Sequence, residues 1–265
     1  MALPLRARLA ANQHAVGIIG LMELRVSNWL IDRWATGLAG LAHWAKAIRQ
    51  SVLASAVIVA TLMADCWLLG LDMAFRYAVL DGTELPNWFN LSQEMGLGEI
   101  FEHVMTALGI CALLMLFYRH RRRQIAMATI LLALVLADNA LQLHEQVGVV
   151  LGGALPTDLL LPPHQIGELL FLSAFALVAL ATLAPLFHKD IVPVEQAMLL
   201  IVALIGFAAI FGIAVDAVHA MLATGSLQEV VAGSLEDFGE LVGISLAGAF
   251  AVAVAAADPI PATNR

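Results

Sequence analysis

The sequence is poor in charge, since Asp, Glu, Lys and Arg together make up 13% of its 265 residues, against about a quarter in ordinary soluble domains. Hydrophobic residues account for 61% of the chain, and the mean hydropathy is +0.88. Such a composition leaves too little polar surface to cover a soluble core. It excludes a soluble globular protein and a disordered chain, so we expect a polytopic helical membrane protein.

Cysteine is also scarce, and two cysteines are too few for a secreted disulfide scaffold. Cys66 and Cys111 fall at different depths of the chain's apolar segments, which predicts two small core residues without a disulfide. The formal net charge is −8. One basic cluster, Arg119 to Arg123, is better explained as a topology signal than as a phosphate-binding surface, so we expect no nucleic-acid partner.

Six long apolar segments approach or exceed the roughly 20 residues that cross a bilayer. They predict an all-α, six-transmembrane-helix bundle in residues 51–258, followed by a short tail at 259–265. The connectors at 81–96 and 152–163 are rich in turn-forming residues. The six predicted spans cover residues 52–79, 97–118, 124–151, 164–187, 195–223 and 229–257.

Residues 1–50 lack the short apolar core and small-residue cleavage site of a secretory signal, so we expect no processing. Trp29, Trp34 and Trp44 recur with aliphatic residues at helical spacing, opposite charged residues such as Arg33 and Lys46. The pattern predicts an N-terminal amphipathic helix, lying either on the membrane interface or packed as an ordinary cytoplasmic helix.

Basic residues are distributed unevenly between the two sides of the predicted bundle. With six spans, every Lys and Arg except Arg76 lies on one side of the membrane. Because cytoplasmic loops retain positive charge, we expect a bacterial inner (plasma) membrane protein with both termini in the cytoplasm.

A weak internal repeat relates the predicted helices. Each helix that returns from the outside carries a Gly-Glu pair, and each outgoing helix carries an Asp toward its outer end. The pattern predicts three helical hairpins with a period of very roughly 75 residues and acids at matched depths. The residues concerned are Gly98-Glu99, Gly167-Glu168, Gly239-Glu240, Asp65, Asp138 and Asp216. We interpret Gly167, Gly239, Gly243 and Gly248 as sites of close helix packing, because no strand precedes them to form a phosphate loop.

Ionisable residues gather in the outer halves of the predicted spans, whereas inner halves such as 107–118 and 201–215 contain none. An ionised carboxylate inside a bilayer costs at least about 2.5 kcal/mol, and Arg76 is the one fixed cation nearby. Protonation, pairing with histidinium and metal binding can each relieve this cost. We favour a bound divalent metal, because histidine and carboxylate together are good metal ligands.

Since the layer contains no cysteine, the donor set suits Zn, Fe, Mn or Ca, with Zn or Fe/Mn favoured. Spacings of three or four residues place several of these groups on shared helix faces. Glu102, Glu145 and Asp237 are predicted as general bases or as groups that support the ligands. The predicted metal ligands are His103, Asp138, His164, Glu168, Asp216, His219, Glu236 and Glu240.

These features lead to three hypotheses for function. The first is a metal-dependent hydrolase or oxidoreductase that acts on a lipid-like or quinone-like substrate at the outer side. The second is a non-catalytic binding, assembly or pH-sensing subunit with a structural cation, in a membrane complex or a homo-oligomer. The third is an outward-facing cation transporter, which the apolar inner halves and the lack of broken helices disfavour.

Overall fold

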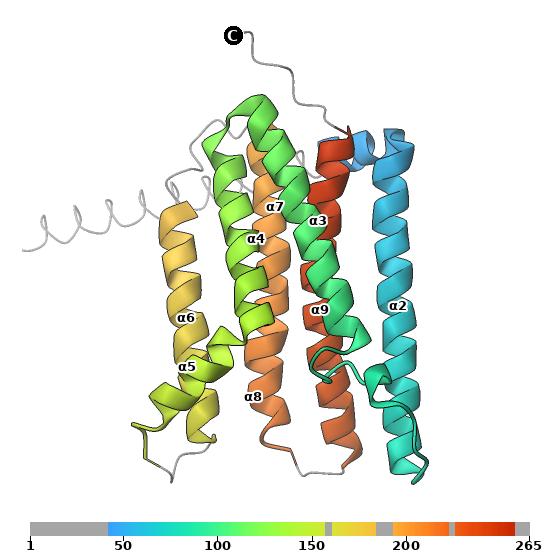
Figure 1. Cartoon of the computed structure of the whole chain (residues 1–265), viewed down its shortest axis with the longest axis vertical. Coiled ribbons are helices and arrows are strands. Elements are labelled where there is room, and N and C mark those ends of the chain that lie inside the picture. The colour runs from blue at the N-terminus through green and yellow to red at the C-terminus, as the bar shows by residue number, and fades with distance from the viewer. Residues whose placement is uncertain (1–41, 157–160, 184–192, 223–225, 258–265) are drawn as a thin grey trace, which may run out of the picture. The chain divides into compact units, whose positions relative to one another are not determined.

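The computed structural model describes residues 42–156, 161–183, 193–222 and 226–257. The chain divides into two compact units, Met1–His43 and Trp44–Arg265. Most of the predicted amphipathic helix and the predicted tail at 259–265 lie outside the described residues. The described residues of the second unit form helices and turns without a strand (Figure 1).

Six helices of the second unit are long and apolar enough to cross a membrane, which confirms the predicted all-α bundle. Two short helices lie in the connectors of the bundle: η1 (Asn87–Phe89) precedes the second long helix, and α5 (Leu143–Gly152) precedes the fourth. The fifth long helix continues from α7 through a π-helical segment, η3 (Phe211–Val215), into α8 (Asp216–His219). The other bounds are α2 (Val52–Leu80), α3 (Leu97–His120), α4 (Arg123–Leu141), α6 (Pro163–Leu183), α7 (Pro193–Ile210) and α9 (Leu227–Ala257).

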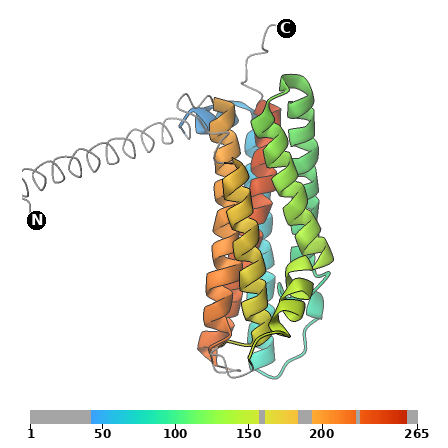
Figure 2. The same ribbon diagram turned by 90° about the vertical axis from the view of Figure 1, so that its left-hand side faces the viewer.

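Helix α9 is the central element, and it packs against α2, α3 and α7 (Figures 1 and 2). Small residues allow this close packing. A Cβ atom at Gly109 would lie 2.8 Å from Gly248 Cα, and one at Gly243 would lie 2.7 Å from Ala208 Cβ. A Cβ atom at Gly239 would overlap the Phe211 ring. The predicted role of these glycines in helix packing is therefore confirmed.

Helix α6 is the least buried of the six long helices. It makes extensive contacts only with α5, where Gly148 and Gly167 bring the two backbones together. Further along α6, Leu170, Leu177 and Leu180 are exposed. One end of α6 is therefore fixed to α5, while apolar side chains along the rest of the helix are exposed.

The prediction of one continuous span over 124–151 is wrong. Helix α4 ends at Leu141, and Gln142 adopts a left-handed conformation with φ 50° and ψ 43° before α5 begins. The Asp138 carboxylate accepts a hydrogen bond from the His144 backbone N–H at 3.0 Å, and so satisfies a free donor at the start of α5. This capping bond offsets the left-handed conformation, which costs roughly 1–2 kcal/mol in a residue with a Cβ atom.

Two further expectations fail, the first because of the direction in which side chains point and the second because of a residue's position along its helix. Cys66 and Cys111 are free and exposed, since their neighbours Asp65 and Ala112 occupy the buried positions of α2 and α3. Asp65 lies near the middle of α2, where Ser245 Oγ donates to its carboxylate at 3.0 Å. It does not share the level of Asp138 and Asp216, which lie near helix ends.

We call the end of the bundle where α2 ends and α3, α6 and α9 begin the acidic end, which is the lower end in Figure 1. The opposite end, with the α3–α4 turn at Arg121 and Arg122, is the basic end. A fully buried apolar cluster that includes Leu116, Ile125 and Phe250 packs toward the basic end. The polar cavity described below lies at the acidic end.

Candidate functional site

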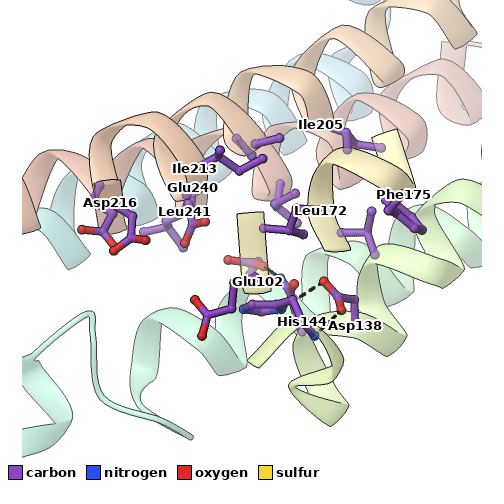
Figure 3. Close-up of a pocket in the computed structure, with 18 of the residues that line it drawn as sticks. Glu102, Asp138, His144, Leu172, Phe175, Ile205, Ile213, Asp216, Glu240 and Leu241 are labelled. Atoms are coloured by element: carbon purple, nitrogen blue, oxygen red, sulfur yellow. Dashed lines mark hydrogen bonds and ion pairs between the residues drawn. The ribbon is translucent and has the colours of Figure 1, made fainter. Parts of the chain in front are cut away.

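A cavity of about 880 Å³ opens at the acidic end, between α3, α4, α6, α7 and α9. In Figure 3, Glu102, Asp216 and Glu240 lie at one end of it, and Leu172 and Phe175 lie further along. The structure brings all of the predicted site residues except His103 and His219 into its lining. Those that line it are Glu102, Asp138, Glu145, His164, Glu168, Asp216, Glu236, Asp237 and Glu240.

Three of the predicted metal ligands converge closely enough to hold one ion. Asp216 and His219 come from α8, and Glu236 comes from α9; one ligand atom from each lies within 4.8 Å of the other two. This is the only such group of three or more side chains among the described residues. One imidazole and two carboxylates form a donor set that suits Zn, Fe or Mn.

Glu229 contacts this group through His219. From the sequence, Glu229 looks like a solvated charge at the start of a helix. His219 Nδ1 lies 2.7 Å from Glu236 Oε2, and His219 Nε2 lies 3.4 Å from Glu229 Oε1. Ligating histidines commonly donate their second ring N–H to a carboxylate, which fixes the tautomer. The spacing of ten residues between His219 and Glu229 gives no periodic signal for this contact.

Asp138 and His144 form a second polar pair on the opposite wall of the cavity (Figure 3). Their side chains approach to 3.1 Å. Burial lowers the pKa of His144, but the hydrogen bond and charge of Asp138, with the charges of Glu145 and Glu168, outweigh it and leave the pKa raised. Asp138 is therefore engaged with both the backbone and the ring of His144, which separates it from the metal group.

Among the predicted site residues that line the cavity, three carboxylates have no hydrogen bond or ion pair to another described residue: Glu168, Asp216 and Glu240. Glu240 lies against Gly212 in the π-helical segment, where a Cβ atom would collide with its carboxylate. A π-helical turn is a frequent feature of functional sites. In contrast, the nearly buried Glu102 accepts a hydrogen bond from Asn139.

Asp237 belongs to an ion-pair network instead of the metal group. Arg76 donates to Asp72 at 2.7 Å and to Asp237 at 2.5 Å. Ser92 donates to Asp237 at 2.6 Å, and the Leu91 backbone N–H donates to Asp72 at 3.0 Å. The network fixes the connector before α3 to α2 and α9. The four-residue spacing of Asp72 and Arg76 is the sequence signal for it.

His103 is not brought to the cavity. Its Nε2 lies 3.8 Å from Glu99 Oε1, on the preceding turn of α3, and has no hydrogen-bond partner among the residues that the structure describes. His164 does line the cavity, but it is exposed and takes no part in the group of three.

No curated protein and no solved structure shows significant similarity to this chain. One protein family matches it, over residues 51–254, which include five of the long helices, all but the last three residues of α9, and every residue that lines the cavity. The match covers well over half of the sequence. The chain therefore belongs to the family described as Domain of unknown function (DUF8692).

Proposed function

We propose that this protein is a membrane-embedded, metal-dependent enzyme that acts on an amphiphilic substrate. One observation carries the proposal: Asp216 and Glu236, which form a group with His219, line the polar end of a cavity whose remainder is apolar. A reacting head group can bind there while its hydrocarbon tail stays in an apolar environment.

The metal would supply Lewis acidity and an activated water, which suits hydrolysis if it is Zn and also permits oxidation if it is Fe or Mn. Asp216, His219 and Glu236 would hold it, and Glu229 would orient the His219 ring through the second nitrogen. Three protein ligands leave further coordination positions open to water or substrate.

Glu240 is the best-placed proton acceptor beside this group. It lies one helical turn along α9 from Glu236, on the same helix face, and no described residue engages its carboxylate by a hydrogen bond or an ion pair. An unengaged carboxylate within reach of the substrate is suited to general-base work. Glu102 is the less suitable choice because Asn139 already binds it.

A site open on one side of the membrane fits these observations better than a transport path. The apolar cluster that includes Leu116 and Ile125 packs tightly toward the basic end. We further propose that the acidic end faces outward from a bacterial inner membrane, since the basic residues then lie on the cytoplasmic side.

Elemental mass spectrometry of the protein purified in mild detergent tests the proposal. We expect stoichiometric Zn, Fe or Mn in the wild type, and loss of most of it in His219→Gln and Glu236→Gln. His103→Gln is the matched control, because His103 lies outside the cavity, and this variant should retain the metal. A folded wild-type protein without metal, or equal retention by all three variants, would overturn the proposal.

A further inference from the structure

The cavity has two regions of opposite chemistry. Its acidic end carries carboxylates and histidines, and beyond them its lining on α6 runs through Leu169, Leu172, Phe175 and Leu180 without a charged group. The facing wall, from Ile213 back to Val202, is apolar as well. A molecule that fills both regions must be an amphiphile.

The dimensions fit one hydrocarbon chain. The apolar lining covers residues 169–180 of α6 and 202–213 of α7 and η3, and each stretch is about 16 Å long at 1.5 Å per residue. Carbon–carbon bonds of about 1.5 Å advance an extended chain by roughly 1.3 Å, so this length holds roughly a dozen methylene groups. A volume of about 880 Å³ lies within the usual range for a site that encloses one small ligand.

The side of the cavity along α6 offers a route for such a chain from the bilayer. Helix α6 is fixed to α5 at its first two turns, where Gly167 meets Gly148, and packs extensively against no other described helix. A lipid chain therefore does not have to pass through water to reach Leu172 and Phe175.

The charge at the acidic end selects the head group. Glu168 and Glu240 have no hydrogen-bond or ion-pair partner among the described residues, and Glu145 is half exposed at the same end. Arg76 is held by Asp72 and Asp237, and His144 is held by Asp138. One divalent ion would leave an excess of negative charge. An ammonium group can donate to these carboxylates, whereas a carboxylate or phosphate head is repelled.

We infer that the cavity binds a single-chain amphiphile with a primary amine head group, which lies among the carboxylates of the acidic end, Glu168 and Glu240 among them, while the chain lies between α6 and α7. This inference rests on the proposed function, because it names the substrate class of the same site.

A photoreactive dodecylamine with a diazirine at the far end of its chain tests the inference, with the protein in phosphatidylcholine nanodiscs. We expect labelled peptides from residues 169–180 and 202–213. Unlabelled dodecylamine should compete roughly tenfold better than dodecanoic acid or dodecanol, the ratio that about 1.4 kcal/mol produces. Equal competition by the three compounds, or labelling spread over all lipid-facing helices, would overturn the inference.

Two alanines of α6, two residues apart, provide a matched pair of variants. Ala176 lines the cavity, whereas Ala174 is exposed and does not. Ala176→Phe should reduce the labelling severalfold and Ala174→Phe should leave it unchanged; equal effects would contradict the assignment. Glu168→Gln with Glu240→Gln should remove the preference for the amine over dodecanol.

Repeating the labelling after metal chelation separates this inference from the proposed function. Selective amine labelling of a protein that never holds metal would overturn the enzyme proposal alone. Stoichiometric metal with no preference for the amine would overturn the head-group assignment alone.

Discussion

His144 and Asp138 show how one carboxylate serves both backbone and side chain. Asp138 accepts from the His144 backbone N–H and lies 3.1 Å from its Nδ1. The second contact depends on the charge of the ring, and the pKa of His144 is raised by Asp138, Glu145 and Glu168 against the opposing effect of burial. The ionic part of this contact therefore contributes to stability only while the ring is protonated.

We predict that His144→Gln costs up to about 1 kcal/mol at acid pH, as for a partly exposed ion pair, and that the cost disappears as pH rises. Because the folded-state pKa is raised, the stabilisation is complete below the unfolded value of about 6.5 and is lost as pH rises through the folded value. Thermal unfolding of both proteins across this pH range measures the difference. In an Asp138→Asn background, the cost should depend less strongly on pH, because only the charges of Glu145 and Glu168 then act on the ring.

Replacing Arg76 should lower the stability of the protein more than replacing a cation on the open surface, because the Arg76 side chain is largely buried. Its guanidinium neutralises Asp72, whose side chain is fully buried, and Asp237. We predict that Arg76→Gln destabilises the protein by about 3 kcal/mol or more, because an unpaired charge then remains buried. Thermal unfolding in detergent measures this loss.

The control for Arg76→Gln removes the stranded charge. In the double variant Arg76→Gln with Asp72→Asn, part of the lost stability should return. If the two losses simply add, Asp72 and Arg76 do not act as a pair and the interpretation is wrong.

At the scale of the helices, close packing through glycine is what allows α9 to occupy the centre of the bundle. The backbone of Gly248 meets that of Met105 and Gly109 on α3. The same kind of contact joins α5 to α6 at Gly148 and Gly167. These contacts replace side-chain packing with direct approach of the helix backbones, as is common between membrane helices.

We predict opposite effects of two Gly→Ala substitutions. Gly248→Ala should destabilise the protein, because the new Cβ atom would overlap the Met105 carbonyl group on α3. Gly70→Ala should raise the stability by about 0.5–1 kcal/mol, because alanine is the better helix former and nothing lies within 4 Å of its Cβ atom. Comparing the two melting temperatures tests the packing role, and a loss of stability in both variants would contradict it.

At the scale of the whole molecule, α2 runs from the basic end of the bundle to its acidic end, so the residues that flank it mark the two ends. Lys46 precedes α2 and Thr83 follows it, and both residues are exposed. Basic residues are retained in the cytoplasm, so we propose that Lys46 faces the cytoplasm and Thr83 faces outward.

We predict that a membrane-impermeant maleimide labels Thr83→Cys in intact cells and labels Lys46→Cys only after permeabilisation. Cys66 and Cys111 are replaced by alanine in both variants, because both are exposed on the bundle surface. Reversed labelling would invert the proposed orientation. Labelling of both positions from one side would show that α2 does not cross the membrane.

The amino-acid sequence alone determined the all-α bundle and its six long apolar helices, because twenty-residue apolar runs admit few other structures. It also located the acidic layer, since the cost of burying charge makes ionisable residues conspicuous in such helices. It identified Gly239, Gly243 and Gly248 as packing sites, because small residues in an apolar helix have few other uses.

Only the tertiary structure decided which of those acids act together. Asp216, His219 and Glu236 converge because α8 packs against the first part of α9, a contact without sequence periodicity. Asp237 pairs with Arg76 and so takes no part in that group. The hydrogen bond that the His144 backbone N–H donates to Asp138 stabilises the end of α4 beside Gln142, which is neither Gly nor Pro. Pairing between groups distant in sequence depends on how whole helices pack, which local patterns do not encode.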